Sequence, residues 1–315
     1  MFGGIEAGGT KFVCGVGTGP DDVKTAQFPT STPDITVASV IEFFQSEAGS
    51  RLQAIGIGSF GPVDLDPTSA TYGHITSTPK AGWENFNLLG TVQQALGVPA
   101  ALETDVNVAL LGEEKWGAAN KLGDAVYLTI GTGIGGAVTA HGQLIHGFLH
   151  PEIGHLRIPH DRAKDPFEGL CRFHGDCLEG LASGPAMQVR WGVPAATLPP
   201  GHPAWELEAH YLALALMNLT VTLCPRRILM GGGVMQQAQL FPLIRKDFSA
   251  LMNEYIWRRE VMEELEEYIQ PPGLGSRSGI LGALVLAQNV FSDAMLARTV
   301  EGWSSPEDKE GKKRA

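Results

Sequence analysis

The chain has 315 residues and a formal net charge of −11, with 43% hydrophobic and 18% charged residues. This length allows two domains that each bury a core of their own. An acidic chain repels phosphate backbones, which argues against nucleic acid as a partner. We see no apolar run of about 18 residues and no basic leader after Met1, and so expect a cytoplasmic protein that binds no membrane.

The first expected element is a hairpin. Residues 2–6 and 12–16 are rich in β-forming residues and flank the turn Ala7-Gly8-Gly9-Thr10. Glycines in such a turn let backbone N–H groups approach phosphate oxygens, and the Thr10 hydroxyl adds a donor. The segment therefore predicts a phosphate-binding hairpin.

A turn of the same design recurs at Gly131-Thr132-Gly133-Ile134-Gly135-Gly136, after the apolar residues 128–130. Neither turn has the spacing of a P-loop or of a dinucleotide-binding strand-to-helix turn. The pair predicts two similar halves that hold one nucleotide. A third turn, Gly231-Gly232-Gly233, follows a helix-like stretch at 207–224 and a short strand.

Asp105 lies between a strand-like segment at 98–102 and a helical one at 108–113. Position alone leaves two interpretations open, a helix N-cap and a catalytic base. Residues 18–34 and 192–204 are rich in Pro, Gly, Thr and Ala and are expected to be loops. Residues 280–298 are expected to form a helix.

Two of the four cysteines indicate a metal site. Cys171 and Cys177 bracket His174, and His155 precedes Cys171 by sixteen residues, which gives four ligands for a tetrahedral Zn²⁺. Four protein ligands close the coordination shell, so the zinc is expected to be structural. Cys14 and Cys224 occur in apolar contexts and are expected to be buried thiols.

The expected zinc would also fix two carboxylates. Glu152 precedes His155 by three residues, and Glu179 follows Cys177 by two. Such glutamates can accept hydrogen bonds from adjacent sugar hydroxyls, and the second nitrogen of a zinc-bound imidazole can make another contact. Without the metal, either residue would be interpreted as a solvated surface charge.

Together these motifs resemble the ROK family (repressor, open reading frame, kinase), within the superfamily of sugar kinases, actin and Hsp70. The three glycine turns occur in the order of its phosphate-1, phosphate-2 and adenosine motifs. The matching signature segments are Glu152-x-Gly154-His155, Cys171 to Gly184, Ser59 to Asp64 and Thr78 to Trp83, and the last two are similar to zinc-containing bacterial fructokinases. The resemblance covers residues 3 to 290. It implies ATP-dependent phosphorylation of a hexose at its 6-hydroxyl, with fructose favoured and mannose or glucose as alternatives.

The resemblance also implies roles for single residues. Asp105 matches the catalytic base, which takes the hydroxyl proton as the phosphoryl group moves. Glu6 replaces the Asp that usually ends the first strand, and is expected to organise the Mg²⁺ of Mg-ATP through water. Thr104 stands where glucose-preferring relatives usually carry Asn, which fits a different sugar.

Binding residues follow from the same resemblance. Sugar contacts are expected from Gly61, Lys80, Thr104, Glu152, His155 and Glu179. ATP contacts are expected from Gly8, Gly9, Thr10, Lys11, Thr132, Gly133, Pro185, Gly231, Gly232 and Gly233. For Lys11, solvation at the hairpin edge remains an alternative. The family implies a homodimer.

The fold class implied is α/β, a two-domain actin-like or RNase H-like ATPase fold with ATP and sugar in the interdomain cleft. We expect a small domain at 1–115, with the helix 280–298 packing back on it, a larger one at 116–279 and a disordered tail at 301–315. Two alternatives are a sugar-responsive repressor, which would need a DNA-binding segment before the first hairpin, and a catalytically silent sugar-binding module.

Overall fold

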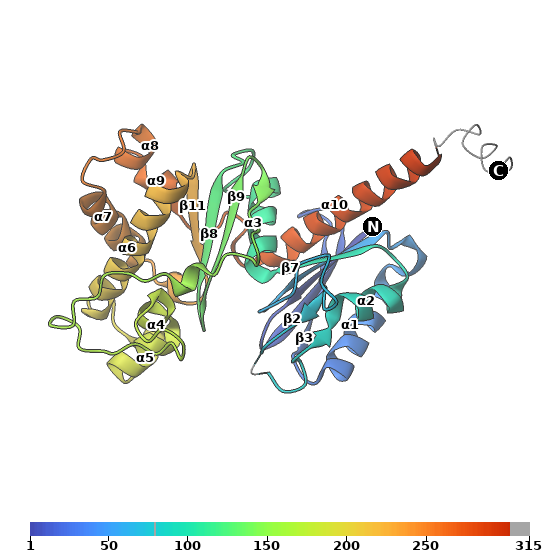
Figure 1. Cartoon of the computed structure of the whole chain (residues 1–315), viewed down its shortest axis with the longest axis horizontal. Helices are drawn as coiled ribbons and strands as arrows, with labels where there is room; N and C mark the ends of the chain where they lie inside the picture. The colour runs from blue at the N-terminus through green and yellow to red at the C-terminus, as the bar shows by residue number, and fades with distance from the viewer. Residues whose placement is uncertain (79, 303–315) are drawn as a thin grey trace, which may run out of the picture. The chain divides into compact units, whose positions relative to one another are not determined.

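The computed structural model describes residues 1–78 and 80–302 (Figure 1). The chain divides into two compact units, Met1–Leu111 with Gly279–Ala315, and Gly112–Ser278. The first division falls within helix α3 (Asp105–Trp116), which also contains the boundary expected at residue 115. Most of the expected tail, including Trp303, lies outside the described residues.

The first unit is built on a five-stranded sheet with the order β3-β2-β1-β4-β7. β1 (Phe2–Ala7) and β2 (Lys11–Gly17) form the predicted antiparallel hairpin. β4 (Ala54–Ser59) and β7 (Ala100–Thr104) continue the sheet in parallel. A separate pair, β5 (His74–Ile75) and β6 (Phe86–Asn87), is antiparallel.

The loop expected at residues 18–34 is wrong in part, because β3 (Lys24–Pro29) lies within it and pairs with β2. β3 is an edge strand whose residues are exposed or only partly buried. It therefore lacks the apolar run that announces a buried strand. The second expected loop, at 192–204, contains only a short 3-10 helix at Ala195–Thr197.

Helices cover both faces of this sheet. Successive residues of a strand point to opposite faces. A side chain at Gly3 would meet Phe44 of α1 (Pro33–Glu47), and one at Gly4 would meet Ile280 of α10 (Ser278–Gly302). α10 thus packs on the face opposite α1, and α2 (Leu88–Leu96) packs beside α1.

The apolar helix α10 contradicts one expectation from the sequence. Gly275–Ala297 is long and apolar enough to cross a membrane by length and composition, with a mean hydropathy of 1.6, so the expectation that no run qualifies is wrong. In the structure Ile280, Leu281 and Ala283 of this helix are at most 3% exposed. Its apolar side is therefore accounted for by packing on the sheet.

The second unit repeats the topology of the first. Its sheet has the order β10-β9-β8-β11-β12, with β8, β9 and β10 antiparallel and β11 and β12 parallel to β8. The strands are β8 (Ala125–Ile130), β9 (Ile134–Ala140), β10 (Gln143–Leu144), β11 (Arg227–Gly231) and β12 (Ile269–Gln270). The prediction of two similar halves is thus confirmed at the level of strand order.

The core of the second unit includes most of α6 (Ala204–Leu223), which packs against α7 (Leu240–Met252). The α6 sequence is apolar on nearly all sides because the helix is buried within the unit. The other helices of this unit are α4 (Leu178–Ala182), α5 (Gly184–Trp191), α8 (Arg259–Met262) and α9 (Leu265–Tyr268), with 3-10 turns at Ile153–His155, Val234–Gln236 and Gly275–Arg277. The first unit has a 3-10 turn at Gly49–Arg51.

Cys14 is fully buried in β2, as predicted. Cys224 is exposed, and the prediction for it is wrong. It follows the last residue of α6 in a left-handed conformation with φ 45°, where the chain leaves the core.

Candidate functional site

The first glycine turn closes tightly and presents an open tip. The Gly8 N–H donates to the Lys11 carbonyl at 3.0 Å, and a Cβ placed on Gly9 would meet no atom within 4 Å. Thr10 is exposed beside it. Backbone at this tip is therefore accessible to an anion. Lys11 is exposed at the hairpin edge, where its Nζ lies 3.3 Å from the Gln27 Oε1.

Two carboxylates with raised pKa values lie in the first unit. Burial raises the pKa of Asp105 to about 6. Burial first and the Asp105 charge second raise the pKa of Glu6 to about 7, against the opposing effect of Lys11. Two neighbouring carboxylates of this kind attract a cation and provide a proton acceptor near neutral pH.

The structure assigns the N-cap of α3 to Thr104 rather than to Asp105. The Thr104 Oγ1 accepts the Asn107 N–H at 3.1 Å, which is the N-cap interaction of α3. Asp105 is the first helical residue, and one of its oxygens accepts the Val106 N–H at 2.8 Å. Because Thr104 caps the helix, the second Asp105 oxygen is not needed for capping.

Sequence reasoning missed a residue that shapes the Glu6 environment. A Cβ placed on Gly279 would lie 2.6 Å from the Glu6 Cδ and within 2.9 Å of both its carboxylate oxygens. The first turn of α10 thus leaves room for the Glu6 carboxylate only because residue 279 has no side chain. No motif marked this glycine, because it lies some 270 residues from Glu6 in the chain.

The loop that carries Lys80 is anchored by Trp83. Trp83 is fully buried, its Nε1 donates to the Ser31 carbonyl at 2.8 Å, and its ring packs on Phe12 at 5.2 Å between centroids. Lys80 is half-buried in this loop, and Gly61 is exposed in the segment after β4. Pro79 lies outside the described residues.

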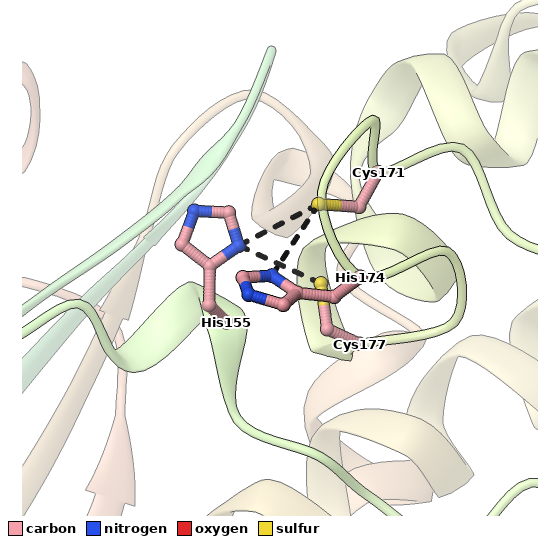
Figure 2. Close-up of side chains that lie close together, drawn as sticks. All are labelled: His155, Cys171, His174 and Cys177. Carbon is pink, nitrogen blue, oxygen red and sulfur yellow. Dashed lines mark hydrogen bonds between the residues drawn. The ribbon is translucent and has the colours of Figure 1, made fainter.

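In the second unit the four predicted metal ligands converge (Figure 2). His155 comes from the 3-10 turn at 153–155, and Cys171, His174 and Cys177 come from the loop before α4. Their ligand atoms all lie within 4.8 Å of one another. The cluster therefore fits a single ion.

The distances match zinc geometry. The Cys171 Sγ lies 3.7 Å from the Nδ1 atoms of both His155 and His174, and the Cys177 Sγ lies 3.6 Å from the His155 Nδ1. Tetrahedral zinc with ordinary bond lengths separates sulfur and nitrogen ligands by about 3.6 Å. Burial, with a smaller effect of Cys171, raises the pKa of Cys177 to about 11. The thiolate form of Cys177 would therefore be stabilised by a nearby cation.

A network that the sequence did not reveal supports this loop. The Arg157 guanidinium donates to the His174 carbonyl at 2.6 Å and pairs with Asp176 at 2.8 Å. Asp176 also pairs with the buried His160 at 3.2 Å, whose Nε2 lies 2.9 Å from the Asp165 carbonyl. These contacts orient the backbone on both sides of the ligands.

The second glycine turn lies against the metal-binding segments. The Glu179 Oε2 accepts the Ile134 N–H at 2.9 Å, and the Gly184 N–H donates to the Gly131 carbonyl at 2.8 Å. Thr132 is exposed at the turn, whereas Gly133 is partly buried against Glu179. Glu152 is half exposed and lies 3.5 Å from the His150 Nδ1.

The third glycine turn packs on the end of β8. Gly232 has φ +94°, and a side chain there would collide with the Ile130 backbone. A side chain at Gly231 would meet the Tyr127 hydroxyl at 2.6 Å, whereas one at Gly233 would meet no atom within 4 Å. Pro185 lies in the first turn of α5. Packing thus requires glycine at the first two positions, whereas the space around the third glycine is open.

A buried carboxylate that the sequence did not single out lies in the second unit. Glu113 is fully buried, and its Oε2 accepts the N–H groups of Ala118 at 2.7 Å and Gly273 at 2.9 Å. Its Oε1 accepts the Leu274 N–H at 2.9 Å and the Ser278 Oγ–H at 2.7 Å. Four donors satisfy this charge within the second unit.

Two sheets of one topology, each with an open glycine turn after its first strand, define the actin-like ATPase fold of sugar kinases. Solved structures agree. A ROK hexokinase from Thermus thermophilus superposes with a TM-score of 0.75 at 27% identity, covering 93% of this chain and 99% of the hexokinase. A ROK glucokinase from Streptomyces griseus, in complex with glucose and AMPPNP, has a TM-score of 0.71 at 24% identity over 91% of this chain and 99% of its own.

Sequence comparison then identifies the family. The chain belongs to the ROK family, which matches residues 2–290. It is 50% identical to a putative fructokinase of Bacillus subtilis over 92% of this chain and 96% of that protein. It is 43% identical to a fructokinase of Lactococcus lactis subsp. cremoris over 92% of this chain and 98% of the relative.

Proposed function

We propose that this protein is an ATP-dependent hexose 6-kinase that converts D-fructose and ATP to D-fructose 6-phosphate and ADP. The observation that carries the proposal is Asp105, a half-buried carboxylate at the start of α3 with a pKa raised to about 6. Fructokinases among the relatives, at 39–50% identity, support fructose as the sugar.

Asp105 is the proposed general base. Its carboxylate accepts the proton of the sugar hydroxyl as that oxygen bonds to the γ-phosphorus and the bond to ADP breaks. The raised pKa keeps Asp105 able to accept a proton near neutral pH. Most of the rate enhancement then comes from positioning and from neutralising charge on the phosphates.

The nucleotide is proposed to be held by donors at glycine turns. Gly8, Gly9, Thr10 and Lys11 belong to the first turn, Thr132 and Gly133 to the second, and Gly231, Gly232 and Gly233, with Pro185, to the adenosine side. The open tips at Gly9 and Gly233 support this assignment. Glu6 is the residue that would hold Mg²⁺ through water, and the bound ion would supply neutralisation of phosphate charge.

The sugar is proposed to bind Glu152, His155 and Glu179, with Thr104, Lys80 and Gly61 completing the contacts. The metal-ligand cluster supports a structural zinc, which would hold His155 with its Nε2 available to a sugar hydroxyl. A mannose or glucose kinase is the alternative, favoured by the glucokinases among the relatives. We further propose a cytoplasmic homodimer.

An ADP-release assay across fructose, mannose, glucose and N-acetylated hexosamines tests the proposal. The expected result is turnover that requires ATP and divalent cation and a kcat/KM highest for fructose. A higher kcat/KM for glucose or mannose would assign the alternative sugar, and absence of turnover with every hexose would contradict a kinase.

A further inference from the structure

The turn after β8 is held by the same segments that carry the metal ligands. Glu179 follows Cys177 by two residues in α4, and its Oε2 accepts the Ile134 N–H at 2.9 Å. Five residues after Glu179, at the first residue of α5, the Gly184 N–H donates to the Gly131 carbonyl at 2.8 Å. The consecutive helices α4 and α5 thus contact both ends of the turn.

A second arm reaches the same turn. A side chain on Gly154, the neighbour of His155, would collide with the Ile134 carbonyl, and one on Gly136 would meet Ile153 at 2.6 Å. The 3-10 turn at 153–155 therefore packs against the start of β9. Both arms end in ligands of the cluster, so the cluster and the turn form one continuous packed region.

Glu179 is the charged contact in this region. A charge-assisted bond to a backbone N–H is among the stronger hydrogen bonds in proteins. A Cβ on Gly133 would lie 2.7 Å from the Glu179 Oε2, so the carboxylate occupies the space that a side chain at 133 would need. A side chain at residue 133 and the Glu179 carboxylate therefore cannot occupy these positions together.

We propose that Glu179 is a positioning residue for the nucleotide turn as well as a sugar contact, and that it makes the binding of sugar and nucleotide interdependent. One oxygen accepts the Ile134 N–H, and the same carboxylate is a sugar contact in the proposed function, on which this inference rests. Sugar that engages Glu179 orders the same carboxylate that shapes the phosphate turn. Binding of either ligand then reduces the conformational entropy that is lost when the other ligand binds.

Calorimetric titration with ADP in the absence of sugar tests this role. Glu179→Ala is expected to weaken ADP binding at least about fivefold, because the Ile134 N–H loses its partner. Glu179→Gln is expected to retain ADP affinity within about twofold, since an amide oxygen still accepts that N–H. The matched control is Glu206→Ala, which removes an exposed glutamate in the first turn of α6 and is expected to leave ADP affinity unchanged.

A double-mutant cycle provides a second test that does not rest on the Glu179→Ala variant alone. Gly133→Ala is expected to weaken ADP binding at least about fivefold in the wild type and less in the Glu179→Ala background, where the space is free. Additive effects, or an ADP affinity in Glu179→Ala equal to that of the wild type, would overturn the proposal. ADP binding can be measured whichever sugar is phosphorylated, so failure here is distinct from failure of the proposed function.

Discussion

Among single residues, Asp105 is the proposed base, and its environment sets the pH range in which it could act. Burial disfavours the charged carboxylate and raises the pKa of Asp105 to about 6. Since the base must be deprotonated to accept a proton, kcat/KM is expected to fall tenfold per pH unit below about 6 and to level off above it. A pH profile of the wild-type enzyme measures this. A profile flat from pH 5 to 8 would place the base elsewhere.

Removing the same charge should lower activity and raise stability. Asp105→Asn is expected to lose several orders of magnitude in kcat while still binding ADP. A folded-state pKa above the unfolded value means that stability is lost as pH rises through about 4 to 6. At pH 8 the free energy of unfolding of the variant should therefore exceed that of the wild type by roughly 1–2 kcal/mol, as measured by denaturant titration. At pH 4 the variant should show no such gain in stability. Equal stability at pH 8 would refute the burial cost.

Thr104 offers a test of sugar choice. Its hydroxyl caps α3 through the Asn107 N–H, and Asn caps helices equally well, so Thr104→Asn should preserve the fold. If an amide here reads a glucose hydroxyl, kcat/KM should shift toward glucose over fructose by roughly fivefold to a hundredfold. Thr104→Ser, which keeps the hydroxyl, serves as the control. An unchanged ratio would direct attention to Lys80.

Of the structural elements, the metal-binding loop between the 153–155 turn and α4 makes the clearest prediction. Mass spectrometry of the native protein should find about one zinc per chain. Cys171→Ser should lose the metal and weaken fructose binding, because the loop holds His155 and Glu179. Cys224→Ser is the matched control, since this exposed thiol lies outside the cluster. Native protein without zinc would contradict the site.

The end of α3 depends on a different carboxylate. The Glu113 carboxylate is fully buried and accepts four hydrogen bonds. Glu113→Gln would replace one of its oxygens by an NH₂ group, which would face two of the donors and could not accept from them. The free energy of unfolding should fall by about 2–4 kcal/mol. Glu266→Gln, at an ion pair of 4.0 Å whose carboxylate is 91% exposed, should change it by less than about 0.5 kcal/mol. Urea titration measures the free energy of unfolding of both variants. Equal losses would show that the hydrogen bonds of Glu113 stabilise the fold no more than the Glu266 ion pair does.

Sequence reasoning predicted those elements whose signal is local. The hairpins at Gly8-Gly9 and Gly131 to Gly133, and the metal ligands around His174, were found because glycine, cysteine and histidine at short spacings have few other uses. β3 was missed because an edge strand shows no buried run. Glu113 and Gly279 were missed because their partners lie far away in the chain, and only the fold brings them together.

At the scale of the whole chain, the repeated sheet order accounts for the two glycine turns. Each unit places its turn between the first two strands of an antiparallel meander that continues into parallel strands. An equivalent turn in each sheet provides a set of backbone donors without requiring a basic chain. This explains how a protein with a net charge of −11 can bind an anionic nucleotide.

The central claim is that ATP phosphorylates fructose at its 6-hydroxyl with Asp105 as base. Phosphorus and carbon NMR of the product formed from fructose and ATP tests it most directly. We expect fructose 6-phosphate and ADP in equal amounts with the wild-type enzyme, and no sugar phosphate above background with Asp105→Asn. Fructose 1-phosphate as the product, or undiminished product formation by Asp105→Asn, would contradict the account.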